Sequence, residues 1–254
     1  MCEIFAVSST KRMRVEPLLR EFFSDSVEHP HGWGLAWRDK GRARLYKEPV
    51  TAVESAYLDY LLKLDIKPHL LIAHIRNATR GIVSYANCHP FLEQGSDGRE
   101  WVFAHNGTVL DETALGARRP SQGDTDSEQL ALALVERLDA AAEEAQGTLS
   151  FEQRFAVLED AMAALSVGNK LNLVFSDGEY LYAHTNTDQA TLFERQEEGC
   201  ALLCSRPIGD GWEELPRCTL MAWRDGVPMR RGAAHGSSFD NELYMRIIAE
   251  EQQA

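Results

Sequence analysis

The second residue of the chain is a cysteine, and this position allows a chemistry that an internal cysteine lacks. If Met1 is removed, Cys2 becomes the first residue and carries a thiol and a free α-amine together. An α-amine has a pKa of about 8 and a thiol one of about 8.5, so a neutral amine can accept the thiol proton. Cys2 is therefore a candidate nucleophile with its own general base. The alternative is a small buried residue at the start of a strand.

An arginine follows an apolar run later in the chain. The run Leu70-Leu71-Ile72 leads into the segment 73–81, which contains Arg76. A guanidinium at the end of a buried strand can bind a carboxylate through two parallel hydrogen bonds. The alternative is a surface arginine at a strand end.

The pair Asn106-Gly107 follows a second apolar run. Asn-Gly is a strong signal for a tight turn between strands. The same pair is suited to an oxyanion hole, because the Asn106 amide and the Gly107 N–H, made available by the freedom of glycine in φ, are hydrogen-bond donors. The two interpretations are compatible.

The segment Thr125-Asp126-Ser127-Glu128 predicts the start of a helix. Thr125 fits the N-cap and Glu128 the third helical position, which together form a capping box. This pattern explains Thr125 and Glu128 without any catalytic role. It leaves Asp126 facing outward, where its carboxylate can hold an ammonium group.

Taken together, these segments resemble class II glutamine amidotransferase domains, which belong to the N-terminal nucleophile hydrolases. The order and approximate spacing match at Cys2 and at residues 74–81, 104–108 and 125–128. Residues 31–36 and 87–91 are similar to the stand-alone branch of that family, and residues 171–178 and 204–208 resemble later strands of the same domain. The resemblance spans nearly the whole chain.

The resemblance implies an enzyme that cleaves the γ-glutamyl amide bond of glutamine or of a γ-glutamyl conjugate. Cys2 would attack the side-chain carboxamide while its α-amine relays the proton. Asn106 and Gly107 would stabilise the oxyanion. A γ-glutamyl thioester on Cys2 would form as ammonia or an amine leaves, and water or another acceptor would then resolve it.

The resemblance also implies how the substrate is held. Arg76 would bind the α-carboxylate, Asp126 the α-ammonium, and Thr79 would help to seat the glutamyl group. Two residues depart from the synthase-linked members: Asn77 stands where those have an aromatic residue, and His31 precedes the Gly-Trp-Gly segment. These departures leave the leaving group and the acyl acceptor open.

A second class of function remains in competition with the enzyme. The chain could be a catalytically idle member of the fold that senses glutamine or binds another protein. A binding module, however, has no need for both a nucleophile and oxyanion donors, so the set of Cys2, Arg76, Asn106, Gly107 and Asp126 favours the enzyme. A separate ammonia-accepting synthase is a possible partner, and so is a second copy of the chain.

Composition is consistent with one compact domain over residues 2–254. The 254 residues can bury a substantial core, and the net charge of −13 argues against nucleic acid or anionic membranes as partners. No apolar stretch of about 18 residues occurs, and basic residues from Lys11 onward interrupt any signal-peptide core. We therefore expect a cytoplasmic protein. The odd number of cysteines, five, fits a reducing compartment, and their spacing predicts neither a metal site nor a cofactor.

Hydrophobic periodicity predicts alternating strands and helices, an α+β chain. The family resemblance specifies a four-layer αββα sandwich of the N-terminal nucleophile hydrolase type. Predicted strands cover residues 3–8, 34–38, 43–47, 69–74, 101–105, 170–176, 180–184, 191–195, 200–205 and 219–223. Predicted helices cover residues 53–64, 126–144, 151–165 and 240–253. The loop 115–123 lies near Asp126 in the chain and could act as a lid.

Overall fold

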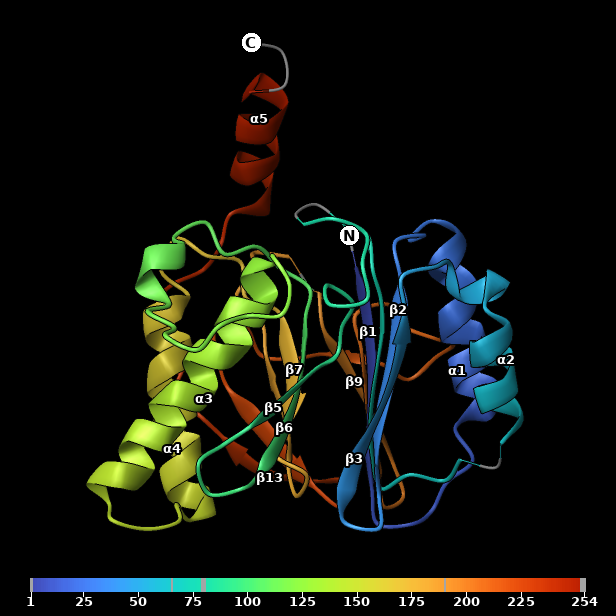
Figure 1. Cartoon of the computed structure of the whole chain (residues 1–254), viewed down its shortest axis with the longest axis horizontal. Helices are drawn as coiled ribbons and strands as arrows, with labels where there is room; N and C mark the ends of the chain where they lie inside the picture. Colours follow the sequence, from blue (N-terminus) through green and yellow to red (C-terminus); the bar gives the residue numbers. More distant parts are fainter. Residues whose placement is uncertain (1, 65, 79–80, 190, 252–254) are drawn as a thin grey trace.

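Two antiparallel sheets lie face to face in the computed structural model, which describes residues 2–64, 66–78, 81–189 and 191–251, without the side chains of 247–251 (Figure 1). In spatial order, the seven-stranded sheet contains β11 (Glu213–Glu214), β9 (Phe193–Glu197), β10 (Cys200–Cys204), β1 (Glu3–Ser9), β4 (Leu70–Ile75), β2 (Trp33–Asp39) and β3 (Arg42–Glu48). The six-stranded sheet contains β13 (Val227–Arg231), β12 (Met221–Arg224), β8 (Leu181–His184), β7 (Leu173–Ser176), β6 (Glu100–His105) and β5 (Phe91–Gln94).

A pair of helices covers the outer face of each sheet. These are α1 (Glu16–Ser24) and α2 (Ala56–Lys63) on the seven-stranded sheet, and α3 (Asp126–Glu144) and α4 (Phe151–Leu165) on the six-stranded sheet. Short 3₁₀ turns lie at Asp25–Val27, Ala52–Glu54 and Glu112–Ala114. The order helix, sheet, sheet, helix confirms the predicted four-layer αββα sandwich.

Alternation along the central strands builds three separate cores. In β1, Phe5 and Val7 face the helices α1 and α2, whereas Ile4 and Ala6 face the other sheet. Successive side chains of a strand point to opposite faces, so a strand that is apolar throughout must be covered on both sides. The third core lies between the six-stranded sheet and the helices α3 and α4.

Most predicted elements are present, and two helices have the predicted bounds, α3 and α4. The predicted strand 170–176 begins only at Leu173, because residues 170–172 leave the regular ladder. One described α-helix and three described strands were not predicted: α1, β5, β11 and β13. Within the described chain, no helix is both long and apolar enough to cross a membrane.

The start of α3 differs in part from the predicted capping box. The Thr125 side chain accepts a hydrogen bond from the Glu128 N–H at 3.3 Å, as expected for an N-cap. The Glu128 carboxylate, however, accepts from the N–H groups of Gln122 and Gly123, at 2.8 and 2.7 Å. Glu128 therefore fixes the preceding loop and does not close a capping box.

The C-terminal helix α5 (Asn241–Glu251) projects from the body of the molecule at the end where the N-terminus lies (Figure 1). Leu243 and Met245 are 48% and 57% exposed. Tyr244 packs against Phe239, with 5.4 Å between the ring centroids.

Candidate active site

The pairing of the central strands sets the position of Cys2. It directly precedes β1, whose first residue Glu3 pairs with Ile75 at the end of β4. Arg76 follows Ile75, so the candidate nucleophile and the candidate carboxylate-binding residue leave neighbouring strands at the same edge of the sheet. Trp33, the first residue of β2, pairs with Ile75 from the other side.

The Cys2 thiol is half-buried against the segment after Arg76. The Asn77 N–H donates to Cys2 Sγ at 3.2 Å, and the thiol lies 3.4 Å from the Asn77 carbonyl oxygen, to which it can donate. Burial raises the pKa of the Cys2 thiol, and the Asn77 hydrogen bond and the Arg76 charge oppose this effect. The thiol therefore needs a base before it can attack a carboxamide.

Asn106 reaches the same point from the opposite sheet. It follows β6, and its side-chain amide donates a hydrogen bond to the backbone carbonyl of Cys2. The Asn106 backbone is held by Asn172: the Asn106 N–H donates to the Asn172 carbonyl and the Asn172 amide donates to the Asn106 carbonyl, both at 2.9 Å. The structure thus brings the start of β1 and the end of β6 together and places Asn106 beside Cys2.

The Asn-Gly pair does not form the predicted hairpin turn. After β6, Asn106 lies alongside Asn172 and Thr108 forms a β-bridge with Lys170. Gly107 is required by close approach, because a Cβ atom there would lie 2.0 Å from the Lys170 carbonyl oxygen. A positive φ plays no part in this requirement. No acceptor for the Gly107 N–H occurs among the described residues.

Arg76 is a buried residue, with 2% of its surface exposed, which rules out the surface alternative. Its guanidinium donates to the Ile82 carbonyl at 3.0 Å and to the Gly81 carbonyl at 3.5 Å. The loop that begins at Arg76 thus folds back over the Arg76 side chain. Thr79, the remaining predicted substrate-binding residue, lies outside the described residues.

Asn87 joins that loop to the start of α3. Its amide donates to the Ile82 carbonyl at 2.9 Å and to the Asp124 carboxylate, and its oxygen accepts from the Asp124 N–H at 3.0 Å. Asn87 is 1% exposed. The position of the Arg76 loop therefore depends on the segment that leads to Asp126.

Asp126 does not face outward as predicted. It is buried, and its Oδ2 accepts a hydrogen bond from the Val109 N–H at 2.7 Å. The loop 106–109 folds over the helix start and supplies this donor, a contact between distant segments that no local pattern indicates. If an ammonium group binds at Asp126, the carboxylate must accept hydrogen bonds from that ammonium and from the Val109 N–H at the same time.

Lys170 was not predicted as part of the site. Its side chain is buried and its Nζ donates to Asn241 Oδ1 at 3.0 Å. Burial lowers the pKa of Lys170, whereas the charges of Asp188 and the Cys2 thiolate oppose this effect. A lysine at the start of an apolar run is usually exposed, which is why the sequence carries no signal for this residue.

The buried histidines differ from one another. The ring nitrogens of His105 both have partners, since they lie 3.0 Å from Ser127 Oγ and from the Lys170 carbonyl oxygen. His74 and His89 lie between the sheets with ring centroids 4.2 Å apart, and no ring nitrogen of either has a hydrogen-bond partner in the described part of the chain. Burial lowers the pKa of His74 to about 3 and that of His89 well below its usual value.

The Gly-Trp-Gly segment has a packing role beside the site. A Cβ atom on Gly34 would lie 1.9 Å from the carbonyl oxygen of His89, so glycine lets the segment before β5 cross β2. His31 accepts a hydrogen bond at Nδ1 from the Ala78 N–H at 3.0 Å. His31 therefore supports the loop that contacts Cys2. Over the described residues, no group of three or more His, Cys, Asp or Glu side chains is placed to hold a metal ion.

Comparison with solved structures shows the same fold. A crystal structure from Pseudomonas aeruginosa, described as a predicted glutamine amidotransferase, aligns with a TM-score of 0.63 at 20% identity and covers 90% of this chain and 100% of that one. The glutamine phosphoribosylpyrophosphate amidotransferase from B. subtilis aligns with a TM-score of 0.69 at 16% identity, over 92% of this chain and 50% of that one. The fold is that of the N-terminal nucleophile amidotransferases.

Sequence comparison extends this result to the family. An uncharacterized protein of Methanocaldococcus jannaschii is 35% identical over 186 residues, which are 72% of this chain but only 50% of that protein. YafJ of Escherichia coli, named as a glutamine amidotransferase, is 31% identical over 183 residues, 71% of this chain and 70% of that one. Residues 1–198 match the class-II glutamine amidotransferases as a family. The chain therefore belongs to the class-II glutamine amidotransferase family.

Proposed function

We propose that this protein cleaves the γ-glutamyl amide bond of glutamine or of a γ-glutamyl conjugate, with Cys2 as the nucleophile. The observation that carries the proposal is the meeting of Cys2 and Asn106 from opposite sheets, with the Asn106 amide bound to the Cys2 carbonyl. A nucleophile beside a side-chain amide donor is the arrangement that acyl transfer requires.

In this proposal, removal of Met1 frees the α-amine of Cys2. The amine accepts the thiol proton, Sγ attacks the amide carbon, and the Asn106 amide and the Gly107 N–H stabilise the oxyanion. The proton then passes to the departing nitrogen, so that the C–N bond breaks and ammonia or an amine leaves. Water attacks the thioester, which releases glutamate and restores the thiol.

Two charged residues would select the amino-acid end of the substrate. The substrate carboxylate would displace the Gly81 carbonyl from Arg76, because at 3.5 Å this is the weaker of the two contacts of that guanidinium described above. Asp126 would accept the substrate ammonium while it keeps the Val109 N–H, since a carboxylate has several acceptor positions. Thr79 would add contacts to the glutamyl group.

The proposal also covers the two acceptors, one for the γ-glutamyl group on Cys2 and one for the released ammonia. Water is the simplest acyl acceptor, and a separate ammonia-accepting synthase is the partner that would use the other product. The chain matches half of the length of the M. jannaschii relative.

A release assay tests the proposal. Glutamine, asparagine and the γ-glutamyl amides of cysteine and taurine would each be incubated with protein whose mass shows that Met1 is absent. We expect turnover of at least one γ-glutamyl amide and none of asparagine, whose side chain is one methylene shorter. Failure of every γ-glutamyl amide, or equal turnover of asparagine, would contradict the proposal.

A further inference from the structure

A cavity lies at the opposite end of the sheets from Cys2. It has a volume of about 640 Å³ and lies at the β2–β3 turn, the segment before β4, and the turns that follow β7 and β12. β1 runs from Cys2 towards this end over seven residues, which corresponds to about 20 Å at 3.3 Å per residue. The cavity is therefore separate from the candidate active site.

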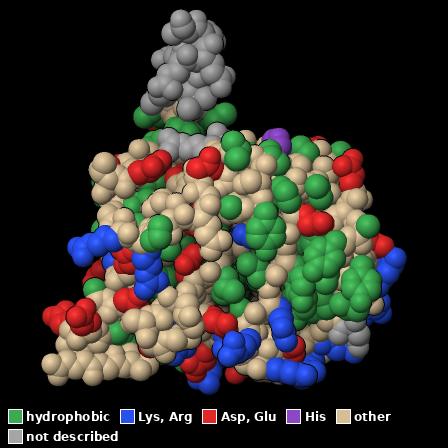
Figure 2. Space-filling model, viewed as in Figure 1, with side chains coloured by type: hydrophobic (Ala, Val, Ile, Leu, Met, Phe, Trp, Pro, Cys, Tyr) green, Lys and Arg blue, Asp and Glu red, His purple; other side chains and the backbone are tan. Residues whose placement is uncertain are grey.

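Cations predominate in the lining of this cavity. Its described lining contains five basic side chains, Arg12, Arg38, Lys40, Lys67 and Arg224, and three acidic ones, Asp39, Glu179 and Asp225. In Figure 2, Lys and Arg side chains gather along the lower edge of the molecule, the end where the β2–β3 hairpin turns in Figure 1. The lining thus has an excess of positive charge, although the whole chain has a net charge of −13.

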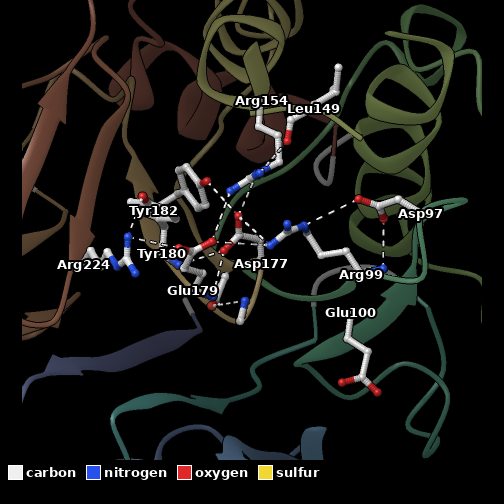
Figure 3. A network of polar contacts seen from close by, with 12 residues as sticks. Asp97, Arg99, Glu100, Leu149, Arg154, Asp177, Glu179, Tyr180, Tyr182 and Arg224 are labelled. Carbon is white, nitrogen blue, oxygen red and sulfur yellow. Dashed lines mark hydrogen bonds and ion pairs between the residues drawn. The ribbon is translucent and has the colours of Figure 1, made fainter. Parts of the chain in front are cut away.

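The acidic side chains of the lining are each paired with a guanidinium. Glu179 lies 3.1 Å from Arg224 and also within 4 Å of two arginines that do not line the cavity, Arg154 at 3.7 Å and Arg99 at 3.9 Å (Figure 3). Those two arginines also surround the buried Asp177, which fixes the cluster in place. Glu179 therefore neutralises Arg224 and is shared with two arginines outside the cavity, so its negative charge is already engaged within this cluster.

The other two acids are paired in the same way. Asp39 lies 3.6 Å from Arg44, which does not line the cavity, and Asp225 lies 3.8 Å from Arg224. By contrast, Arg12 and Lys40 are exposed, and no acid of the described chain lies within ion-pair distance of either. Two cations of the lining are thus available to an anion.

We propose that this cavity binds a small molecule that carries a phosphate or diphosphate group. Guanidinium and ammonium groups are the side chains that recognise phosphate, and the volume is in the range of small-molecule sites. Trp37, half-buried and stacked on Tyr46 at 5.0 Å, adds an aromatic wall that suits the organic part of such a ligand. The strong net negative charge disfavours a long polyanion such as nucleic acid.

The experiment uses inorganic pyrophosphate as the probe and isothermal titration calorimetry on the full chain at physiological salt. We expect saturable binding at one site per chain. The variant Arg12→Gln/Lys40→Asn should weaken it about tenfold or more, as expected for the loss of charge-assisted hydrogen bonds. Asn replaces Lys40 because that residue has a φ of +48°, which asparagine tolerates.

The control variant Arg118→Gln/Arg231→Gln removes the same charge from exposed positions outside the cavity, and it should bind as the native chain does. Three results would overturn the proposal: no saturable binding of pyrophosphate, equal weakening in both double variants, or tighter binding of an oligo-aspartate peptide than of pyrophosphate. Because neither double variant touches the candidate active site, the result is independent of whether γ-glutamyl amides are cleaved.

Discussion

The side-chain amide of Asn106 donates a hydrogen bond to the backbone carbonyl of Cys2, and this contact joins the end of β6 to the start of β1 across the two sheets. It fixes the candidate nucleophile relative to the candidate oxyanion donor. The two residues are 104 positions apart in the chain, so the fold is needed to create the site.

Replacing Asn106 tests the oxyanion hole. Asn106→Ala should lower kcat by about 100- to 1000-fold with a smaller effect on KM, because the donor acts mainly in the transition state. Steady-state kinetics with the γ-glutamyl amide that turns over fastest would measure this. A melting temperature close to that of the native protein would show that lost folding is not the cause. An unchanged kcat would remove Asn106 from the oxyanion hole.

Arg76→Lys tests the carboxylate contact. A lysine keeps the positive charge but cannot provide the paired N–H groups of a guanidinium, so KM should rise about tenfold or more. The comparison needs a substrate whose α-carboxylate is amidated. If Arg76 binds that group, the native enzyme should discriminate strongly against the amidated substrate and the variant much less. Equal discrimination by both proteins would contradict the assignment.

Asp126→Asn tests the ammonium contact. Asparagine keeps a carbonyl oxygen for the Val109 N–H but removes the charge, which makes it a better probe than alanine. For the native enzyme, N-acetylglutamine should have a kcat/KM about ten- to a hundredfold below that of glutamine, since a charge-assisted hydrogen bond is worth about 1.5–3 kcal/mol. In the variant this gap should narrow. Equal rates for the two substrates with the native enzyme would show that Asp126 binds no ammonium.

The buried His74 predicts a loss of stability in acid. The folded chain keeps it neutral, with a pKa of about 3, while the unfolded chain protonates it below about pH 6.5. The unfolded state therefore binds more protons in this range, and the free energy of unfolding falls as the pH falls. His74 alone should contribute a loss of about 2 kcal/mol between pH 8 and pH 5.

Urea unfolding at both pH values measures this contribution. The His74→Phe variant keeps a ring between the sheets. In this variant, the free energy of unfolding should fall between pH 8 and pH 5 by about 2 kcal/mol less than in the native chain. An identical pH dependence in the two proteins would show that His74 does not titrate on unfolding.

Local patterns in the sequence predict the layers of the fold well. The starts of α3 and α4 follow from the N-cap residues Thr125 and Ser150, whose hydrogen bonds are made within one turn. Alternating or continuous apolar residues likewise predict β1 and β4. By contrast, β5 is a four-residue edge strand with too short a pattern to distinguish it from a loop.

The candidate site was predicted less completely, because its supporting contacts are long-range. The residue types at Cys2 and Asn106 indicate their chemistry, and the structure brings the two together. The burial of Asp126 under the Val109 N–H, the link from Asn87 to Asp124 and the burial of Lys170 all depend on how loops pack. No spacing in the sequence encodes these contacts.

The measurement that tests the central claim most directly is thioester trapping at Cys2. Protein with Met1 removed would be incubated with a γ-glutamyl amide and hydroxylamine, and the γ-glutamyl hydroxamate quantified beside the released amine. We predict hydroxamate from the native enzyme and none from Cys2→Ala, whose fold should be unchanged because little volume is removed at a half-buried position. Hydroxamate formation by Cys2→Ala at a rate near that of the native enzyme would contradict Cys2 as the nucleophile.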